Sequence, residues 1–178
     1  DVSALSQDPC FTAEALKKAA TLVQQDKPAV AAQLLNESVS INAQDAEALS
    51  RLAALLREDD PPRALALWQQ AIDLGSTEVE PYLMVGADAE RAGKYPEAQA
   101  VYAKGVTLND ASFDLHHGLA RMLILTGKTD EALVAFRKAA ARGREDRSIL
   151  DEAAVEGFAG FVAPIWTKER RVSVCGYA

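Results

Sequence analysis

The sequence has little of what most enzymes and membrane proteins require. Aromatic residues make up only 6% of its 178 residues, and it contains two histidines and two cysteines. A transmembrane helix needs roughly 18–20 consecutive apolar residues. The most apolar window, Phe158 to Trp166, is much shorter and contains Pro164. We therefore expect no membrane span, and we expect small residues rather than rings to fill most helix crossings.

Basic residues are outnumbered by acidic ones. The sequence has 19 Lys and Arg against 26 Asp and Glu, which gives a net charge of −7 and a pI near 4.9. A nucleic-acid binder needs a basic face that displaces counterions from the phosphate backbone. The composition therefore argues against a nucleic-acid partner.

Motifs that carry chemistry are missing as well. The sequence has no HExxH, no paired-cysteine metal motif, no phosphate-binding glycine loop and no nucleophile elbow. His116 and His117 are adjacent, and adjacent helical residues point about 100° apart, so the two cannot bind one metal as a pair. We predict no catalytic residues, no metal site, no cofactor and no enzymatic activity.

The sequence does not identify the cellular compartment of the protein. Cys10 and Cys175 are the only cysteines, which is too few to identify a redox compartment or to decide whether they pair. No signal peptide is visible, and the chain begins at Asp1 without an initiator methionine. This start is typical of a processed mature protein or of a shortened chain. The alternatives are the cytoplasm and, after processing, the periplasm or the cell exterior.

What the sequence does contain is a helical hairpin at residues 79–112. Gly93 is a helix stop, and Pro96 is suited to the first turn of the next helix. Apolar and small residues three or four positions apart form one stripe on each helix. The stripes are Tyr82, Val85, Gly86 and Ala89, then Ala98, Val101, Tyr102, Gly105 and Leu108. Neither helix can bury such a stripe alone.

The hairpin recurs along the chain. Copies start at Thr12, Ala46, Val79 and Phe113, and a half-copy starts at Arg147. A period of about 34 residues is typical of helix–turn–helix solenoids. Within each copy, small residues flank a large apolar residue in the second helix. The large residues are Leu35, Trp68, Tyr102 and Phe136, and the mid-helix small residues of the first helices are Ala19, Ala53, Gly86 and Ala120.

This pattern resembles the tetratricopeptide repeat (TPR) family over residues 12–158. The first copy departs from the family at Lys18, where the family prefers leucine. The family's proline after the second helix is missing from every copy. The resemblance implies an all-α fold, a right-handed helical-hairpin solenoid forming a TPR-like superhelix.

The expected organisation follows the repeat period. An irregular lead-in, 1–11, precedes four hairpins within 12–146. The hairpins are 12–45, 46–78, 79–112 and 113–146, followed by a capping helix at 147–160 and a tail at 161–178. Helix breaks are predicted near 26, 44, 60, 76, 94, 110, 128 and 144. Trp68, Gly86, Ala98 and His116 are predicted to be buried.

The resemblance also implies a concave groove, lined by the first helices, that binds a peptide or protein segment. Carried over by repeat phase, the groove residues are Glu47, Ser50, Arg57, Glu80, Leu83, Ala87, Arg91, Asp114, His117, Arg121 and Leu125, and Leu16 and Ala20 extend the same wall. We hypothesise that Arg57, Arg91 and Arg121 contact an acidic partner segment. The alternative is that they form ion pairs inside the groove with Glu80, Glu90 and Asp114.

The functional prediction is therefore a non-catalytic protein–protein interaction scaffold, an adaptor or assembly factor. The alternative is a regulatory or substrate-docking TPR segment of a larger enzyme. The positions at which one subclass grips chaperone C-termini hold Leu16, Ala20, Arg51, Glu80 and Met84, without a lysine or an amide, so a chaperone-tail receptor is not expected. In the tail, Phe161, Val162, Ile165 and Trp166 are expected to pack against the last hairpin or into the groove. The groove could belong to this chain or to a neighbour, in a homo-oligomer.

Overall fold

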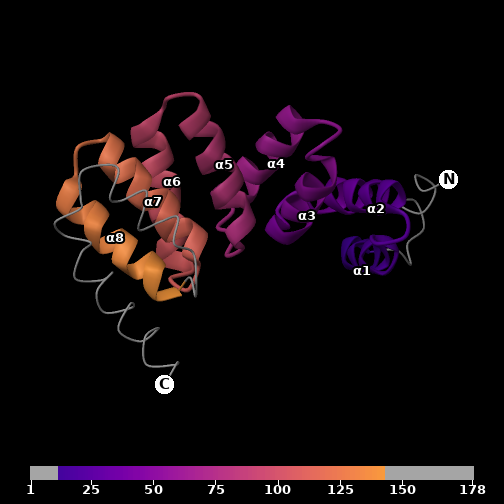
Figure 1. Cartoon of the computed structure of the whole chain (residues 1–178). Helices are drawn as coiled ribbons and strands as arrows, with labels where there is room; N and C mark the ends of the chain where they lie inside the picture. The colour runs from indigo at the N-terminus through magenta and orange to yellow at the C-terminus, as the bar shows by residue number, and fades with distance from the viewer. Residues whose placement is uncertain (1–11, 143–178) are drawn as a thin grey trace, which may run out of the picture. The chain divides into compact units, whose positions relative to one another are not determined.

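The computed structural model describes residues 12–142, which form eight α-helices and no strand (Figure 1). The helices are α1 (Ala13–Val23), α2 (Pro28–Ile41), α3 (Ala46–Leu56), α4 (Pro61–Asp73), α5 (Val79–Arg91), α6 (Tyr95–Leu108), α7 (Phe113–Leu125) and α8 (Thr129–Arg142). The all-α prediction is confirmed. The breaks predicted near 26, 44, 60, 76, 94, 110 and 128 each fall between two helices. The break near 144, the lead-in, the capping helix and the tail lie outside the described residues.

The chain divides into two compact units between Asp88 and Ala89, inside α5. In the first unit α1 packs on α2, α2 on α3, and α3 on α4. In the second unit α6 packs on α7, and α7 on α8. Within each unit these helices therefore pack against their neighbours in sequence, as stacked hairpins require.

Side chains cap the N-termini of several helices. Thr12 Oγ1 accepts from the Ala15 N–H at 3.2 Å, and Asp45 Oδ1 accepts from the Ala48 N–H at 3.0 Å. Asp60 caps α4 in the same way. Each side chain satisfies an amide that has no partner inside its helix. The first turns are therefore fixed by local sequence.

Glycines follow the C-termini of α4, α5 and α7. Gly75, Gly93 and Gly127 have φ of 82°, 73° and 78°. This left-handed conformation carries a steric penalty for residues with a Cβ atom. The helix stop predicted at Gly93 is confirmed.

The core of the first unit is built around Trp68, which is buried as predicted among Leu35, Leu49 and Ala64. The hydroxyl of Tyr82, also buried, donates to the main-chain oxygen of Ser76 at 2.7 Å. This bond ties the start of α5 to the segment after α4. The Tyr82 ring is thereby packed in the core, and its hydroxyl has a hydrogen-bond acceptor.

The departure at Lys18 has a structural explanation. In α3 the positions equivalent to Glu14 and Lys18 are Ala48 and Leu52, which are buried where α3 packs on α2. In α1 the same face is exposed, and Lys18 Nζ lies 3.6 Å from a Glu14 carboxylate oxygen. A charged pair one helical turn apart suits a solvated face. Lysine therefore replaces leucine where this helix has an edge in water.

In the second unit, α6 and α7 approach closely at Gly118. A Cβ atom added to Gly118 would lie 2.8 Å from Cζ of the Tyr102 ring and 2.9 Å from Cε1. Tyr102 is itself buried. Only glycine lets this ring lie flat against the α7 backbone, because any side chain would have to displace it.

We predict that Gly118→Ala destabilises the protein by roughly 1–3 kcal/mol, because the methyl group overlaps the Tyr102 ring. In an unhindered helix the same substitution is stabilising by about 1 kcal/mol. Urea unfolding measures the change. In a Tyr102→Leu background the substitution should lose most of its cost, and an equal cost in both backgrounds would show that the ring is not the obstacle.

Ala98 is completely buried in α6, as predicted, whereas Ala100 two residues later is exposed. We expect Ala98→Leu to lower the free energy of unfolding by roughly 1–3 kcal/mol through overpacking. Ala100→Leu adds the same atoms to the same helix and should change it little. Equal melting temperatures for the two variants would contradict this assignment of the α6 face.

Candidate protein-binding surface

We use the name inner-face residues for the set that repeat phase assigns to the groove. Six belong to the first unit: Glu47, Ser50, Arg57, Glu80, Leu83 and Ala87. Five belong to the second unit: Arg91, Asp114, His117, Arg121 and Leu125. Apart from Ser50, all of them are exposed or half-buried.

In the first unit a lysine joins α1 to α3. Lys17 Nζ lies 3.1 Å from a Glu14 oxygen, 3.0 Å from Asp45 Oδ2 and 2.9 Å from Glu47 Oε2, and the Lys17 side chain is only 12% exposed. Sequence reasoning identified Glu47 but missed Lys17. Lys17 lies 28 residues before Asp45, the N-cap of the next first helix, so the repeat period alone does not pair them. Glu47 is therefore already engaged inside the molecule.

These contacts shift the pKa values of Lys17, Asp45 and Glu14 toward the charged forms. The bond to Glu47, with those to Asp45 and Glu14, raises the pKa of Lys17 despite partial burial. Burial would raise the pKa of Asp45, but the Ala48 amide and the Lys17 ammonium outweigh it and lower that pKa. The bond to Lys17 lowers the pKa of Glu14. The cluster is thus ionised throughout the neutral range.

The neighbouring arginine is also held. Arg51 Nη2 donates to Gln24 Oε1 at 3.1 Å, and Arg51 Nη1 lies 3.8 Å from Glu47 Oε1. Ser50 is 1% exposed, and Leu16 and Ala20 are fully buried. The side chains of these three residues face the core of the unit, so this part of the predicted wall offers no surface to a partner.

Further along the first unit the inner-face residues are more accessible. Arg57 is exposed, and its Nη2 lies 3.6 Å from the adjacent Glu58, a pairing that the sequence analysis did not anticipate. Glu80, Leu83 and Ala87 are half-buried on α5. Met84, next to Leu83, packs against the core of this unit. Of this apolar pair, the structure therefore assigns Met84 to packing.

In the second unit a carboxylate orients Arg121. Arg121 Nη2 lies 2.5 Å from Glu90 Oε1, as the ion-pair alternative predicted. Glu90 is 17% exposed and Arg121 is 42% exposed. The Tyr102 hydroxyl bonds to Glu90, and burial together with the Glu90 charge raises the pKa of Tyr102 to about 12. A buried phenol, a carboxylate and a guanidinium thus connect the core to the surface.

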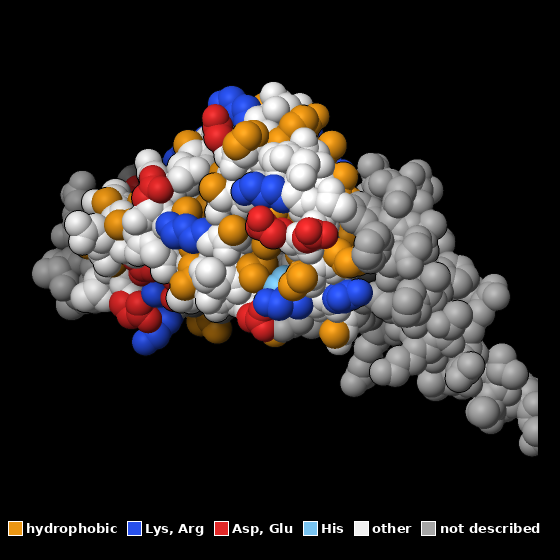
Figure 2. Space-filling model, turned by 90° about the vertical axis from the view of Figure 1, so that its left-hand side faces the viewer, with side chains coloured by type: hydrophobic (Ala, Val, Ile, Leu, Met, Phe, Trp, Pro, Cys, Tyr) orange, Lys and Arg blue, Asp and Glu red, His pale blue; other side chains and the backbone are white. Residues whose placement is uncertain are grey.

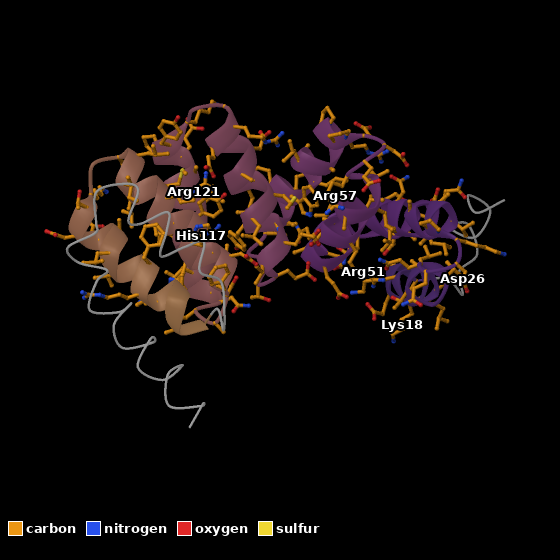
Figure 3. The ribbon with its side chains drawn as sticks, viewed as in Figure 1. Lys18, Asp26, Arg51, Arg57, His117 and Arg121 are labelled. Atoms are coloured by element: carbon orange, nitrogen blue, oxygen red, sulfur yellow. The ribbon has the colours of Figure 1, made fainter. Side chains whose placement is uncertain are left out.

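His117 lies on the same helix as Arg121 (Figure 3). Its ring stacks on Phe113 with centroids 5.7 Å apart, and it lies 6.1 Å from the Phe136 ring of α8. Leu125 is 49% exposed at the end of α7, and Asp114 is exposed near its start. Figure 2 shows basic and acidic side chains interspersed with hydrophobic ones over one face of the molecule.

His116 is buried, which confirms its predicted place in the core. Its Nε2 lies 3.1 Å from both the main-chain oxygen and Oδ1 of Asp110. Nδ1 is buried with no hydrogen-bond partner in the described part of the chain. His116 therefore links α7 to the turn before it and is not an accessible ligand.

A search of residues 12–142 finds no group of His, Cys, Asp and Glu that could hold a metal ion. In that same range, no helix is long and apolar enough to cross a membrane.

Comparison with solved structures identifies the fold. No protein-family model and no curated protein matches the sequence. A structure of MamA is 23% identical, covers 79% of this chain and 82% of its own, and has a TM-score of 0.61. Pseudomonas aeruginosa pilF is 17% identical, with coverages of 90% and 76% and a TM-score of 0.67. YrrB, described as a TPR protein with an unusual peptide-binding site, is 15% identical, with coverages of 94% and 97% and a TM-score of 0.65.

The molecule is thus a helical-hairpin repeat protein. Its fold is that of the tetratricopeptide repeats, as the spacing of small and large residues predicted.

The lysine cluster leads to a prediction about stability and pH. Lys17→Met should lower the free energy of unfolding at pH 7 by roughly 1–3 kcal/mol, since three carboxylates lose their shared donor. Because the pKa values of Asp45 and Glu14 are lowered on folding, the stability that they contribute is present above about pH 4 and is lost below it. The difference in the free energy of unfolding between the wild type and Lys17→Met should therefore become smaller as the pH falls below about 4.

Urea unfolding of both proteins at neutral and acidic pH measures the effect. Lys18→Met is the matched control, because Lys18 is exposed and its Nζ lies 3.6 Å from a single Glu14 oxygen. It should change stability little at any pH. Equal effects of the two substitutions would show that the Lys17 cluster does not stabilise the first unit.

Proposed function

We propose that the protein is a non-catalytic interaction scaffold, an adaptor or assembly factor, whose inner-face residues bind a peptide or protein segment. The observation that carries the proposal is the accessible face of α7. Asp114, His117, Arg121 and Leu125 follow one another at helical spacing and are all exposed or half-exposed. The TPR fold supports the proposal, and so does the peptide-binding site described for YrrB.

The pairing of Arg121 with Glu90 suits a binding role. Glu90 is largely covered, whereas Arg121 keeps much of its surface in solvent. An arginine that is already oriented loses less conformational freedom when it binds a partner. We infer that the partner presents an acidic or carboxylate-bearing segment to Arg91 and Arg121.

Apolar contacts would add to these polar ones. Leu125 is half-exposed beside Arg121, and Leu83 is half-buried on α5. Apolar anchors surrounded by polar groups are the usual composition of a binding hot spot. Arg57 is exposed and belongs to the same proposal, although the nearby Glu58 offsets its charge.

The proposal predicts weaker binding when the charge is reversed. Affinity capture from a native lysate, followed by mass spectrometry, identifies the proteins that the wild-type chain retains. Arg91→Glu with Arg121→Glu should then retain several-fold less of them, because the acidic segment meets like charge. The binding of purified partner to each variant gives the ratio.

Lys104→Glu with Lys128→Glu is the matched control. It makes the same change in net charge at two exposed lysines that are not inner-face residues. It should leave binding nearly unchanged. If the arginine variant remains folded, with a melting curve close to that of the wild type, and still captures the partner fully, the inner-face residues are not the binding site.

A further inference from the structure

A tyrosine, a carboxylate and an arginine from three successive helices meet in the second unit. Glu90 lies near the end of α5, Tyr102 in the middle of α6 and Arg121 in α7. The Tyr102 hydroxyl donates to the Glu90 carboxylate, and Glu90 Oε1 lies 2.5 Å from Arg121 Nη2. Tyr102 is 4% exposed, whereas the Glu90 and Arg121 side chains are 17% and 42% exposed. We name these three residues the Arg121 cluster, which leads from the core to the surface.

Gly118 brings the tyrosine hydroxyl to this place. A Cβ atom added to Gly118 would lie 2.8 Å from Cζ of the Tyr102 ring, 2.9 Å from Cε1 and 3.1 Å from Cδ1. Cζ carries the hydroxyl, so the polar end of the ring lies closest to α7. Gly118 and Arg121 are three residues apart and share one face of the helix. Glycine inside a helix is unfavourable relative to alanine, so α7 is weakened at the point where the ring has to pass.

None of the other three hairpins repeats this arrangement. Residues without a hydroxyl occupy the positions equivalent to Tyr102, namely Leu35, Trp68 and Phe136. Alanines occupy the positions equivalent to Arg121, namely Ala20, Ala54 and Ala87. The positions equivalent to Glu90 hold no carboxylate, but Val23, Arg57 and Ile124. The other hairpins therefore pack without a hydroxyl, a carboxylate or a guanidinium at these positions.

We propose that Tyr102, although buried, is a positioning residue of the protein-binding surface. Its hydroxyl holds Glu90, and Glu90 holds the Arg121 guanidinium in the orientation that a carboxylate of the partner meets. The consequence for binding rests on the proposed function. The link from Tyr102 to Arg121 does not, because it is a property of this chain alone.

The physical reason is the conformational entropy of Arg121. Without the hydroxyl, Glu90 loses a hydrogen-bond donor and its carboxylate is less restricted. Arg121 then samples more orientations in the free protein. A long side chain that is ordered only on binding loses more rotamer freedom at that step, which weakens the complex.

Tyr102→Phe tests the link, because it removes the hydroxyl and keeps the ring. Nitrogen-15 relaxation of the arginine Nε–H groups in the full-length chain measures their order, and Arg121→Lys identifies the Arg121 signal by its loss. The heteronuclear NOE of Arg121 should be close to that of the α7 backbone in the wild type and clearly lower in Tyr102→Phe. An unchanged NOE would overturn the proposal.

Tyr82→Phe is the matched control. Tyr82 is also buried, and its hydroxyl donates to the main-chain oxygen of Ser76 in the first unit. The variant loses a buried hydrogen bond of the same kind outside the Arg121 cluster, so the Arg121 NOE should not change. An equal decrease in both variants would mean that Arg121 responds to a general loss of stability, and the proposal would be wrong.

Glu90→Gln tests the route. It should lower the Arg121 NOE by itself, because the charge that holds the guanidinium is removed. In the Glu90→Gln background, Tyr102→Phe should cause little further decrease, since the hydroxyl acts through Glu90. A further decrease as large as the one in the wild-type background would contradict this route.

Capture from a native lysate measures the consequence for binding. The proteins to be compared are those that the wild-type chain retains and Arg91→Glu with Arg121→Glu loses. Tyr102→Phe should retain several-fold less of them, and Tyr82→Phe should retain the same amounts, with melting curves that show both variants to be folded. Full retention by a Tyr102→Phe variant with a mobile Arg121 would overturn the role of positioning in binding.

The inference and the proposed function fail separately. If Arg121 becomes mobile in Tyr102→Phe but the charge-reversed arginine variant captures the partner fully, the proposed function is wrong and the link to Arg121 stands. If Arg121 keeps its order in Tyr102→Phe but the charge-reversed variant loses the partner, the positioning role is wrong and the proposed function stands.

Discussion

Close approach between neighbouring helices is the constraint on which the rest of the structure depends. A two-helix hairpin cannot bury both of its apolar stripes, so each hairpin needs neighbours at short distance. That distance is set by residues with little or no side chain. The equivalent alanines of the four second helices are fully buried: Ala31, Ala64, Ala98 and Ala132. At Gly118 even a Cβ atom is too large, because it would lie 2.8 Å from the Tyr102 ring.

Ionic contacts add a second kind of link, between successive first helices. Lys17 of α1 binds the cap and first turn of α3, and Arg121 of α7 binds Glu90 near the end of α5. Each link includes one residue, Glu47 or Arg121, that repeat phase assigns to the inner face. The Lys17 side chain is only 12% exposed and already has three carboxylate partners, so it is a poor place to add a ligand, whereas Arg121 is 42% exposed. A partner is therefore expected to use the accessible side of Arg121 and its apolar neighbours rather than the Lys17 cluster.

The sequence predicts most of this fold because its signals are local. Thr12 and Asp45 act as caps, and Gly93 takes positive φ, through contacts within a few residues. The site is less predictable, because its contacts join residues about one repeat apart. Repeat phase puts Ser50 on the groove wall, yet Ser50 is buried. The Lys17 cluster and the division between Asp88 and Ala89 depend on how the helices pack. The periodicity of the sequence does not report that packing.

The connection from Tyr102 through Glu90 to Arg121 shows how the core can prepare a surface residue. Burial and the Glu90 charge raise the pKa of Tyr102 to about 12, and its hydroxyl bonds to Glu90. Glu90, which is bonded to the Tyr102 hydroxyl, in turn fixes the position of the Arg121 guanidinium. A flexible arginine would lose rotamer entropy on binding, and most of that loss is incurred here during folding. The orientation of the Arg121 side chain is therefore a consequence of helix packing. A substitution such as Gly118→Ala, which shifts Tyr102, should also disturb Arg121.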